Sequence, residues 1–416
     1  MEILLKGCNM KDTVQVKNAL WGLFISDAVC MPAHWYYNLD YLKKDFGKIT
    51  GYKDAPHPHP ESFMVGNPYF PDIENAKRIG RPYDILHEHI RFYNTSYSHL
   101  NIDTPVHAGE HGNLMPELED RYHYHHGLKA GENTLGANLV RVLMRSVIKN
   151  GGYEPKSFLD DFVVFMTSSQ TNRDPYLEFY IRDWFENYSK GLPPELCAQS
   201  QRERWSIGAH GGIIRPLVLS LISKNSYEGL GSAISHQQLT HRSENVSSAL
   251  AVLVPFLAYL LRGDEPAELL NEFAKQLPLI KIHGEELTKI YHDFNGPGNI
   301  PKEQMWKIHT EFSDKYLDAI LPTATDKSMI TTRFATACYP EHGVPLIFYF
   351  LYKNSFDFSA SLFDNANAGG DNVHRGMILG LLSGAAAKQI PKSLKTGLAE
   401  YETIKREIDD FVKFCE

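Results

Sequence analysis

The stretch NANAGGDNVHRGMILGLLSGAAAK, residues 365–388, joins a polar turn to a helix made almost wholly of small and apolar side chains. Two glycines, Gly369 and Gly370, lead into Asp371, and His374 follows three residues later. Side chains three apart face the same way from the first turn of a helix. An aspartate here either caps the helix or belongs to a site, and the paired glycines favour a close approach of backbone to another group. The stretch predicts a helix over 374–388 with a candidate site at its beginning.

Helical periodicity dominates the rest of the chain. Apolar residues recur three and four apart, and the pattern over 134–148 stops at Asn150-Gly151-Gly152, which is typical of a helix end. Convincing alternation of period two, which would indicate strands, is hard to find. We therefore expect an all-α protein. The expected helices cover residues 14–31, 134–148, 157–168, 175–188, 211–223, 244–262, 265–276, 303–320, 343–353, 374–388 and 395–414.

The segment of residues 50–126 departs from this pattern. Proline and histidine cluster in DAPHPHPESF, residues 54–63, and glycine, asparagine and aspartate interrupt each periodic stretch. We expect an irregular insertion or lid here, with one helix around 84–93. Because no linker-like composition divides the chain, a single domain over residues 1–416 is predicted.

The composition is that of a globular protein in a reducing compartment. The chain has 416 residues, 43% of them hydrophobic, and a net charge of −8, which argues against a broad nucleic-acid footprint. The five cysteines are scattered and form no CxxC pair. The longest apolar run, residues 249–261, is too short to span a membrane, and no signal peptide is visible. We expect a cytoplasmic protein that binds neither nucleic acid nor membrane.

Three further stretches place polar side chains beside apolar helices. GENTLGANL, residues 131–139, supplies Glu132, Asn133 and Thr134 in a row before a helix, which suits either capping or a site for a hard cation or sugar hydroxyls. SDAVCMPAHWYY, residues 26–37, holds Asp27 and His34, with a proline between them that ends the helix early. Asp27 is interpreted as a structural aspartate that caps or braces a neighbouring helix.

Histidines mark two more candidate positions. His241 follows Thr240 directly before an apolar helix and is typical of a structural residue, while HYHH, residues 123–126, presents alternate imidazoles that suit a transition metal. No phosphate-binding GxxxxGK[ST], GxGxxG, GxSxG or HExxH motif occurs. Phosphoryl transfer, hydride transfer and serine hydrolysis therefore lack support.

The order of these segments resembles the ADP-ribosylglycohydrolase superfamily, which includes the dinitrogenase-reductase-activating glycohydrolases. The resemblance runs from about residue 17 to 395. Five family motifs have counterparts, which are GLFISDAVCMPAH (22–34), GENT (131–134), GAHGGIIRP (208–216), Leu239-Thr240-His241 and NAGGDNVH (367–374). The resemblance implies an all-α orthogonal multi-helix bundle, two magnesium ions in a central cleft, and cleavage of a ribosyl bond through an oxocarbenium-like state.

The chain departs from the family pattern at most ligand positions. His34 stands where the first motif has glutamate, and Asn133 and Val373 stand where the second and last motifs have aspartates. Valine cannot coordinate a metal, so a family-type magnesium pair is in doubt. The remaining imidazoles and carboxylates suit a single manganese, zinc or iron ion instead. Two alternatives stay open, which are a metal-free pocket with His34 or His374 as proton carrier, and a non-catalytic ligand-binding or crystallin-like protein.

We predict a hydrolase that acts on a ribosyl glycosidic bond of an ADP-ribose-like ligand or ADP-ribosylated substrate; a different small-molecule reaction on the same fold is the alternative. Catalytic roles fall to Glu132, Asp371 and His34. The predicted metal ligands are His34, Glu132, Thr134, Asp371 and His374. The predicted ligand-binding residues are Asn133, Thr134, Gly211, Gly212, Arg215, His241, Gly369 and Gly370. The predicted site requires that three helix beginnings, far apart in the sequence, share one pocket. Two of them would each supply an acid, and the third would supply an imidazole.

Overall fold

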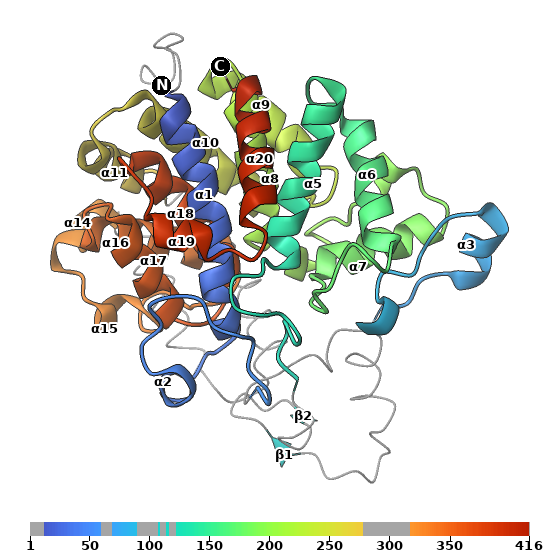
Figure 1. Cartoon of the computed structure of the whole chain (residues 1–416), viewed down its shortest axis with the longest axis horizontal. Helices are drawn as coiled ribbons and strands as arrows, with labels where there is room; N and C mark the ends of the chain where they lie inside the picture. Colours follow the sequence, from blue (N-terminus) through green and yellow to red (C-terminus); the bar gives the residue numbers. More distant parts are fainter. Residues whose placement is uncertain are drawn as a thin grey trace.

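The computed structural model describes residues 12–59, 69–89, 107–108, 114–115, 122–277 and 317–415, and within them the regular secondary structure is almost entirely helical (Figure 1). The longer helices are α1 (Thr13–Cys30), α5 (Leu135–Asn150), α6 (Pro155–Thr167), α7 (Phe179–Ser189), α8 (Gly211–Leu219), α9 (Ser226–Gln237), α10 (Glu244–Arg262), α11 (Pro266–Ala274), α16 (Pro340–Lys353), α17 (Phe358–Asn367), α18 (Asn372–Ala386) and α20 (Tyr401–Phe411). Shorter ones are α2 (Leu39–Phe46), α3 (Ile73–Ile79), α14 (Leu317–Ile320), α15 (Asp326–Met329) and α19 (Lys392–Thr396). The prediction of an all-α fold is confirmed.

The described part of the 50–126 segment is irregular apart from a few short elements. It contains α3, one 3-10 turn at His87–His89 where a helix over 84–93 was expected, and a two-residue antiparallel pair. The strands β1 (His107–Ala108) and β2 (Leu114–Met115) pair His107 with Met115. The rest of the segment, like most of the helix expected at 303–320, lies outside the described residues.

Helices α1 and α18 form the centre of the fold. Both are buried on nearly all sides, as expected for helices whose side chains are apolar or small all round. A Cβ atom added at Gly380 would collide with Ser26 and with the carbonyl of Gly22, and one at Gly384 with the carbonyl of Asn18. Glycine at every fourth position of α18 therefore lets the two helices approach closely. Figure 1 shows α1 running through the middle of the molecule beside α20.

A large side chain at this helix crossing is expected to destabilise the fold. Gly380→Leu must separate α1 from α18 or distort both, and overpacking of this kind costs about 1–3 kcal/mol or more. Gly231→Leu in α9 is the matched control, because nothing lies within 4 Å of a Cβ atom there. Urea denaturation should show a lower free energy of unfolding for the first variant only. Equal free energies of unfolding for the two variants would show that α1 and α18 are not in tight contact at Gly380.

Two predicted helix boundaries need correction. The helix expected over 395–414 is divided, because α19 ends at Thr396 and α20 begins at Tyr401. Between them, the amide of Ala399 donates to the carbonyl of Gly131 at 2.9 Å, so the backbone bonds to the loop before α5. The helix expected at 175–188 begins only at Phe179.

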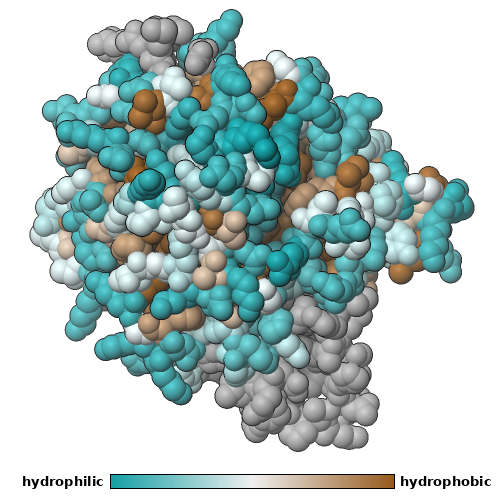
Figure 2. All heavy atoms as spheres, viewed as in Figure 1, coloured by the Kyte–Doolittle hydropathy of each residue, from teal (hydrophilic) through white to brown (hydrophobic). Residues whose placement is uncertain are grey.

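Two stretches have the length and hydropathy of a membrane span, Trp205–Ile222 and Glu244–Arg262. They are 83% and 72% buried inside the fold, as core helices of soluble proteins are. Figure 2 shows a largely hydrophilic face with scattered hydrophobic residues. These stretches are therefore read as core helices.

Candidate functional site

The turn before α18 delivers Asp371 to the interior. Gly369 and Gly370 both adopt left-handed backbone conformations, with φ of 62° and 64°. The amide of Gly370 donates to the carbonyl of Tyr36 at 2.7 Å, and that of Asp371 donates to the carbonyl of Thr336 at 2.7 Å. A Cβ atom at Gly369 or Gly370 would collide with these same carbonyls. The two glycines were expected to admit a ligand, but the space beside them is taken by the protein's own backbone.

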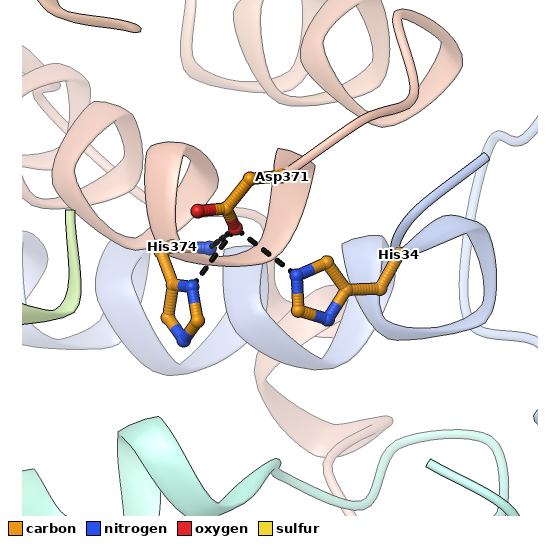
Figure 3. A group of neighbouring side chains, drawn as sticks. All are labelled: His34, Asp371 and His374. Atoms are coloured by element: carbon orange, nitrogen blue, oxygen red, sulfur yellow. Dashed lines mark hydrogen bonds and ion pairs between the residues drawn. The ribbon is translucent and has the colours of Figure 1, made fainter. Parts of the chain in front are cut away.

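Three side chains predicted from two motifs far apart in the sequence meet at this point (Figure 3). Asp371 Oδ1 lies 3.0 Å from His34 Nε2 and 2.9 Å from His374 Nδ1. Donor atoms of the three residues all lie within 4.8 Å of one another, and all three residues are buried. His34 arrives from the turn after α1, as the early helix end at Pro32 predicted. Asp371 also caps α18, since it accepts from the amide of His374.

A third imidazole completes the surroundings of Asp371. His210 Nδ1 lies 3.2 Å from Asp371 Oδ2, and His210 is fully buried. It belongs to the GAHGG motif but was not singled out from the sequence. A Cβ atom at Gly343 in α16 would collide with its ring, so glycine is required there. Both oxygens of Asp371 thus face imidazole nitrogens.

Burial and charge act against each other in this cluster. Burial alone would raise the pKa of Asp371, but His374, His210 and His34 lower it well below its ordinary value. Burial opposes protonation of His374, yet the carboxylates of Asp371 and Glu178 outweigh it and raise the pKa of His374 to about 10. Burial lowers the pKa of His34 well below its usual value, although Asp371 partly opposes this.

Glu178 is the second carboxyl group beside the cluster, and sequence reasoning missed it. Its Oε2 lies 3.6 Å from His374 Nε2, and its side chain keeps 11% exposure. A Cβ atom at Gly211 would collide with this carboxyl group. Gly211 was expected to admit a ligand, and in the structure it admits Glu178. Burial raises the pKa of Glu178, while His374 opposes the shift.

Asp27 holds the beginning of α5 at the GENT motif, residues 131–134. The side chains of this motif do not contact the cluster around Asp371. Thr134 donates to Asp27 from its amide at 2.8 Å and from Oγ1 at 2.6 Å. Asn133 Nδ2 donates to Asp27 at 2.8 Å and to the carbonyl of Phe24 at 2.8 Å. The interpretation of Asp27 as a structural aspartate bracing a neighbouring helix agrees with these contacts. The side chains of Asn133 and Thr134 are therefore engaged in hydrogen bonds with Asp27.

Glu132 points away from the cluster, contrary to the expected convergence of two acids. Its carboxylate accepts from the amide of Lys129 at 2.7 Å and from Arg173 at 2.8 Å. Its side chain is 21% exposed, unlike the fully buried Asp371. The turn after Gly131, which has φ of 85°, directs Glu132 outward. Two of the three expected helix beginnings therefore share the pocket through their side chains.

Arg215 and His241 belong to a second group of buried polar side chains, close enough to Glu178 for the charge of Arg215 to act on its carboxyl group. Arg215 donates to Tyr180 Oη at 2.7 Å and to Thr240 Oγ1 at 2.8 Å. Thr240 Oγ1 lies 3.0 Å from His241 Nδ1, and a Cβ atom at Gly212 would press on the His241 ring. The hydrogen bonds described for Arg215 and His241 stay within this group. Their predicted role in orienting the site stays indirect, through the charge of Arg215 near Glu178.

The donor set does not fit two magnesium ions. Magnesium prefers oxygen ligands in octahedral geometry. The described cluster offers one central carboxylate and two imidazoles, while Val373 is buried and has no donor atom. Asn133 and Thr134 both donate hydrogen bonds to Asp27, so their polar atoms are already engaged.

One transition ion fits the same residues. Two imidazoles and one carboxylate form a set that such ions prefer. Bonds of about 2.1 Å at right angles would place neighbouring donor atoms about 3 Å apart, close to the 3.0 and 2.9 Å observed. His374 Nδ1 is buried and lies 2.9 Å from Asp371 Oδ1, so an ion bound between them would displace the proton that the raised pKa of His374 retains.

A separate groove lies elsewhere on the described surface. It has a volume of about 850 Å³ and runs between α11, the end of α16 and the end of α18, where Leu270, Phe356 and Lys388 line it. None of the cluster residues lines it. The candidate site is therefore the buried cluster at the start of α18.

The fold and this cluster define an all-α protein with an imidazole–carboxylate centre assembled where helices begin and end. The family model for ADP-ribosylglycohydrolases matches residues 10–416, and the chain belongs to this family. A solved structure described as an ADP-ribosylglycohydrolase-related protein complex is similar in fold, with a TM-score of 0.53 and 14% identity over 97% of this chain and 99% of that one. A comparison with curated proteins gives no significant match.

Proposed function

We propose that this chain is a hydrolase for a ribosyl glycosidic bond in an ADP-ribose-like ligand, and that its site surrounds Asp371. We further propose that His34, Asp371 and His374 hold one divalent transition ion. Family membership supports the reaction class. The single observation that carries the proposal is the convergence of these three buried residues, whose donor atoms all lie within 4.8 Å of one another.

The chemistry follows from the groups around the cluster. A bound ion of this kind supplies a Lewis acid for ribose hydroxyls or water. Asp371 keeps negative charge close to the place where an oxocarbenium-like state would develop. Glu178 is the candidate proton donor for the leaving group, since it is next to His374 and retains some exposure. Its raised pKa supports this role, because a carboxyl group must be protonated to act as an acid.

Elemental analysis of the purified full chain tests the metal assignment. We expect about one manganese, zinc or iron ion for each chain, and release of ADP-ribose or a related product from an ADP-ribosylated substrate. Two magnesium ions would contradict the donor set. A protein that holds no ion and leaves ADP-ribosyl substrates intact after prolonged incubation would refute the hydrolase proposal.

A non-catalytic member of the family is the second candidate. It is favoured by one observation, which is that Asp371 is fully buried and faces three imidazole nitrogens that balance its charge. On this alternative, ADP-ribose binds and is recovered unchanged. Equilibrium binding measured beside turnover separates the two candidates. The cytoplasmic location and the small-molecule or ADP-ribosylated substrate stay predictions from the sequence.

A further inference from the structure

A buried chain of hydrogen bonds extends from His34 away from Asp371. His34 Nδ1 lies 2.6 Å from His125 Nε2, and His125 Nδ1 lies 2.8 Å from Asp174 Oδ1. The rings of His34 and His125 are nearly parallel, with 11° between their planes. All three side chains are buried. His125 belongs to the HYHH segment, so one of its imidazoles reaches the site from the side opposite Asp371.

Asp174 is itself fixed by backbone groups. Its Oδ2 accepts from the amide of Leu135 at 2.7 Å, and its Oδ1 accepts from the amide of Tyr176 at 3.1 Å. Leu135 is the first residue of α5, where the helix dipole favours negative charge. Asn172 accepts from the amide of Asp174 at 3.0 Å and fixes the loop. The beginning of α5 therefore reaches the cluster through Asp174 and His125.

When both rings are neutral, these partners assign the proton on each ring. Asp174 accepts, so His125 donates from Nδ1 and leaves Nε2 as an acceptor. His34 then donates from Nδ1 to His125, and its Nε2 carries a lone pair. That lone pair faces Asp371 Oδ1 at 3.0 Å. Two acceptors at this separation repel unless a proton or a metal cation lies between them.

We propose that His125, held by Asp174, is a positioning residue that directs the Nε2 lone pair of His34 toward the ion. The inference rests on the single-ion site of the proposed function. A ligating imidazole commonly donates its second N–H to a fixed acceptor, and loss of that acceptor typically lowers metal affinity 10- to 100-fold. Here the acceptor is a second imidazole backed by a carboxylate. This arrangement fixes both the ring orientation and the tautomer of His34.

The test compares ion affinity in four full-length proteins by calorimetric titration with zinc and manganese chloride. His125→Phe keeps a ring but removes the acceptor, and we expect its affinity to fall roughly 10- to 100-fold. His125→Gln supplies an amide oxygen as acceptor and should regain part of the loss. His236→Phe is the matched control, since His236 is also fully buried and has one 2.6 Å partner, Tyr153, outside the cluster. Its affinity should equal that of the wild type.

A spectroscopic readout keeps the test decisive if His125→Phe folds poorly. Cobalt-loaded Asp174→Asn should show shifted visible absorption, because the tautomer and orientation of His34 would change. Wild-type protein that binds no transition ion refutes the single-ion site itself. Wild-type protein that binds one ion, with unchanged affinity in His125→Phe or an unchanged cobalt spectrum in Asp174→Asn, refutes only the role of His125.

Discussion

Replacement of Asp371 by asparagine is expected to remove the transition ion and with it the reaction. Asparagine caps a helix about as well as aspartate, so α18 keeps its first turn while the cluster loses its central charge. The loss of ion affinity should exceed the roughly 10- to 100-fold expected for a residue that only orients a ligand. Metal content and calorimetric titration of the purified variant provide the measurement.

Asp357→Asn is the matched control for this change. Asp357 caps α17 by accepting from the amide of Ala360 at 2.7 Å, and it has no contact with the cluster. The control should keep its ion and its rate. If Asp371→Asn also binds one ion with wild-type affinity, Asp371 is a helix cap and the site lies elsewhere.

Replacement of Glu178 by glutamine is expected to lower kcat while the ion stays bound. The amide keeps the shape of the side chain and can still accept from His374, but it cannot donate an acidic proton. Loss of a general acid typically lowers the rate 10²- to 10⁴-fold. Glu186→Gln in α7, the helix that Glu178 immediately precedes, is the control, since Glu186 accepts from the amide of Phe70 and is outside the cluster.

The pH dependence of kcat gives a second readout for Glu178. Burial raises the pKa of Glu178, so the carboxyl group keeps its proton to higher pH than an exposed glutamate. The wild-type rate should fall as the pH rises through this pKa, because the acid form is lost. The Glu178→Gln profile should lack that descending limb. A full rate with an unchanged profile would assign proton donation to another group.

The main helices and the central part of the site were predictable from local sequence. The helices α1, α5, α10 and α18 have apolar or small side chains at helical spacing along most of their length, so their existence follows from composition and period alone. Asp371 and His374 share a helix turn, which fixes their relation. His34 was placed beside them because the motif order resembled a family.

Helices with weak patterns were missed. No helix was predicted over α2 and α3, which are short and largely polar, or over α9, which contains two glycines. Their helical form depends on caps and tertiary contacts. Asn38 and Asp72 cap the first two through side-chain hydrogen bonds, and Asn225 caps α9. Such short signals are easily overlooked in a polar stretch.

Glu132 and Glu178 show what a single sequence leaves out. Glu132 stands at a helix beginning like Asp371, but the turn at Gly131 and the bond to Arg173 direct its carboxylate elsewhere. Glu178 carries no motif signal, and its relation to His374 spans almost half the chain. Contacts between residues so far apart in the sequence depend on how the helices cross. The local sequence pattern contains no information about that crossing. The pairing of His125 with His34 was missed for the same reason.

The glycine contact between α1 and α18 has a consequence for how this protein can change. His34 follows the end of α1 and Asp371 precedes the start of α18, so the spacing of these helices also sets the spacing of the proposed ligands. A bulky residue at Gly22 or Gly380 would push α1 and α18 apart and so increase the distance between His34 and Asp371. Heat tolerance and ion retention would then decline together in the same variants. Mutant libraries that aim to alter substrate choice should leave these two glycines untouched and vary the surroundings of Glu178.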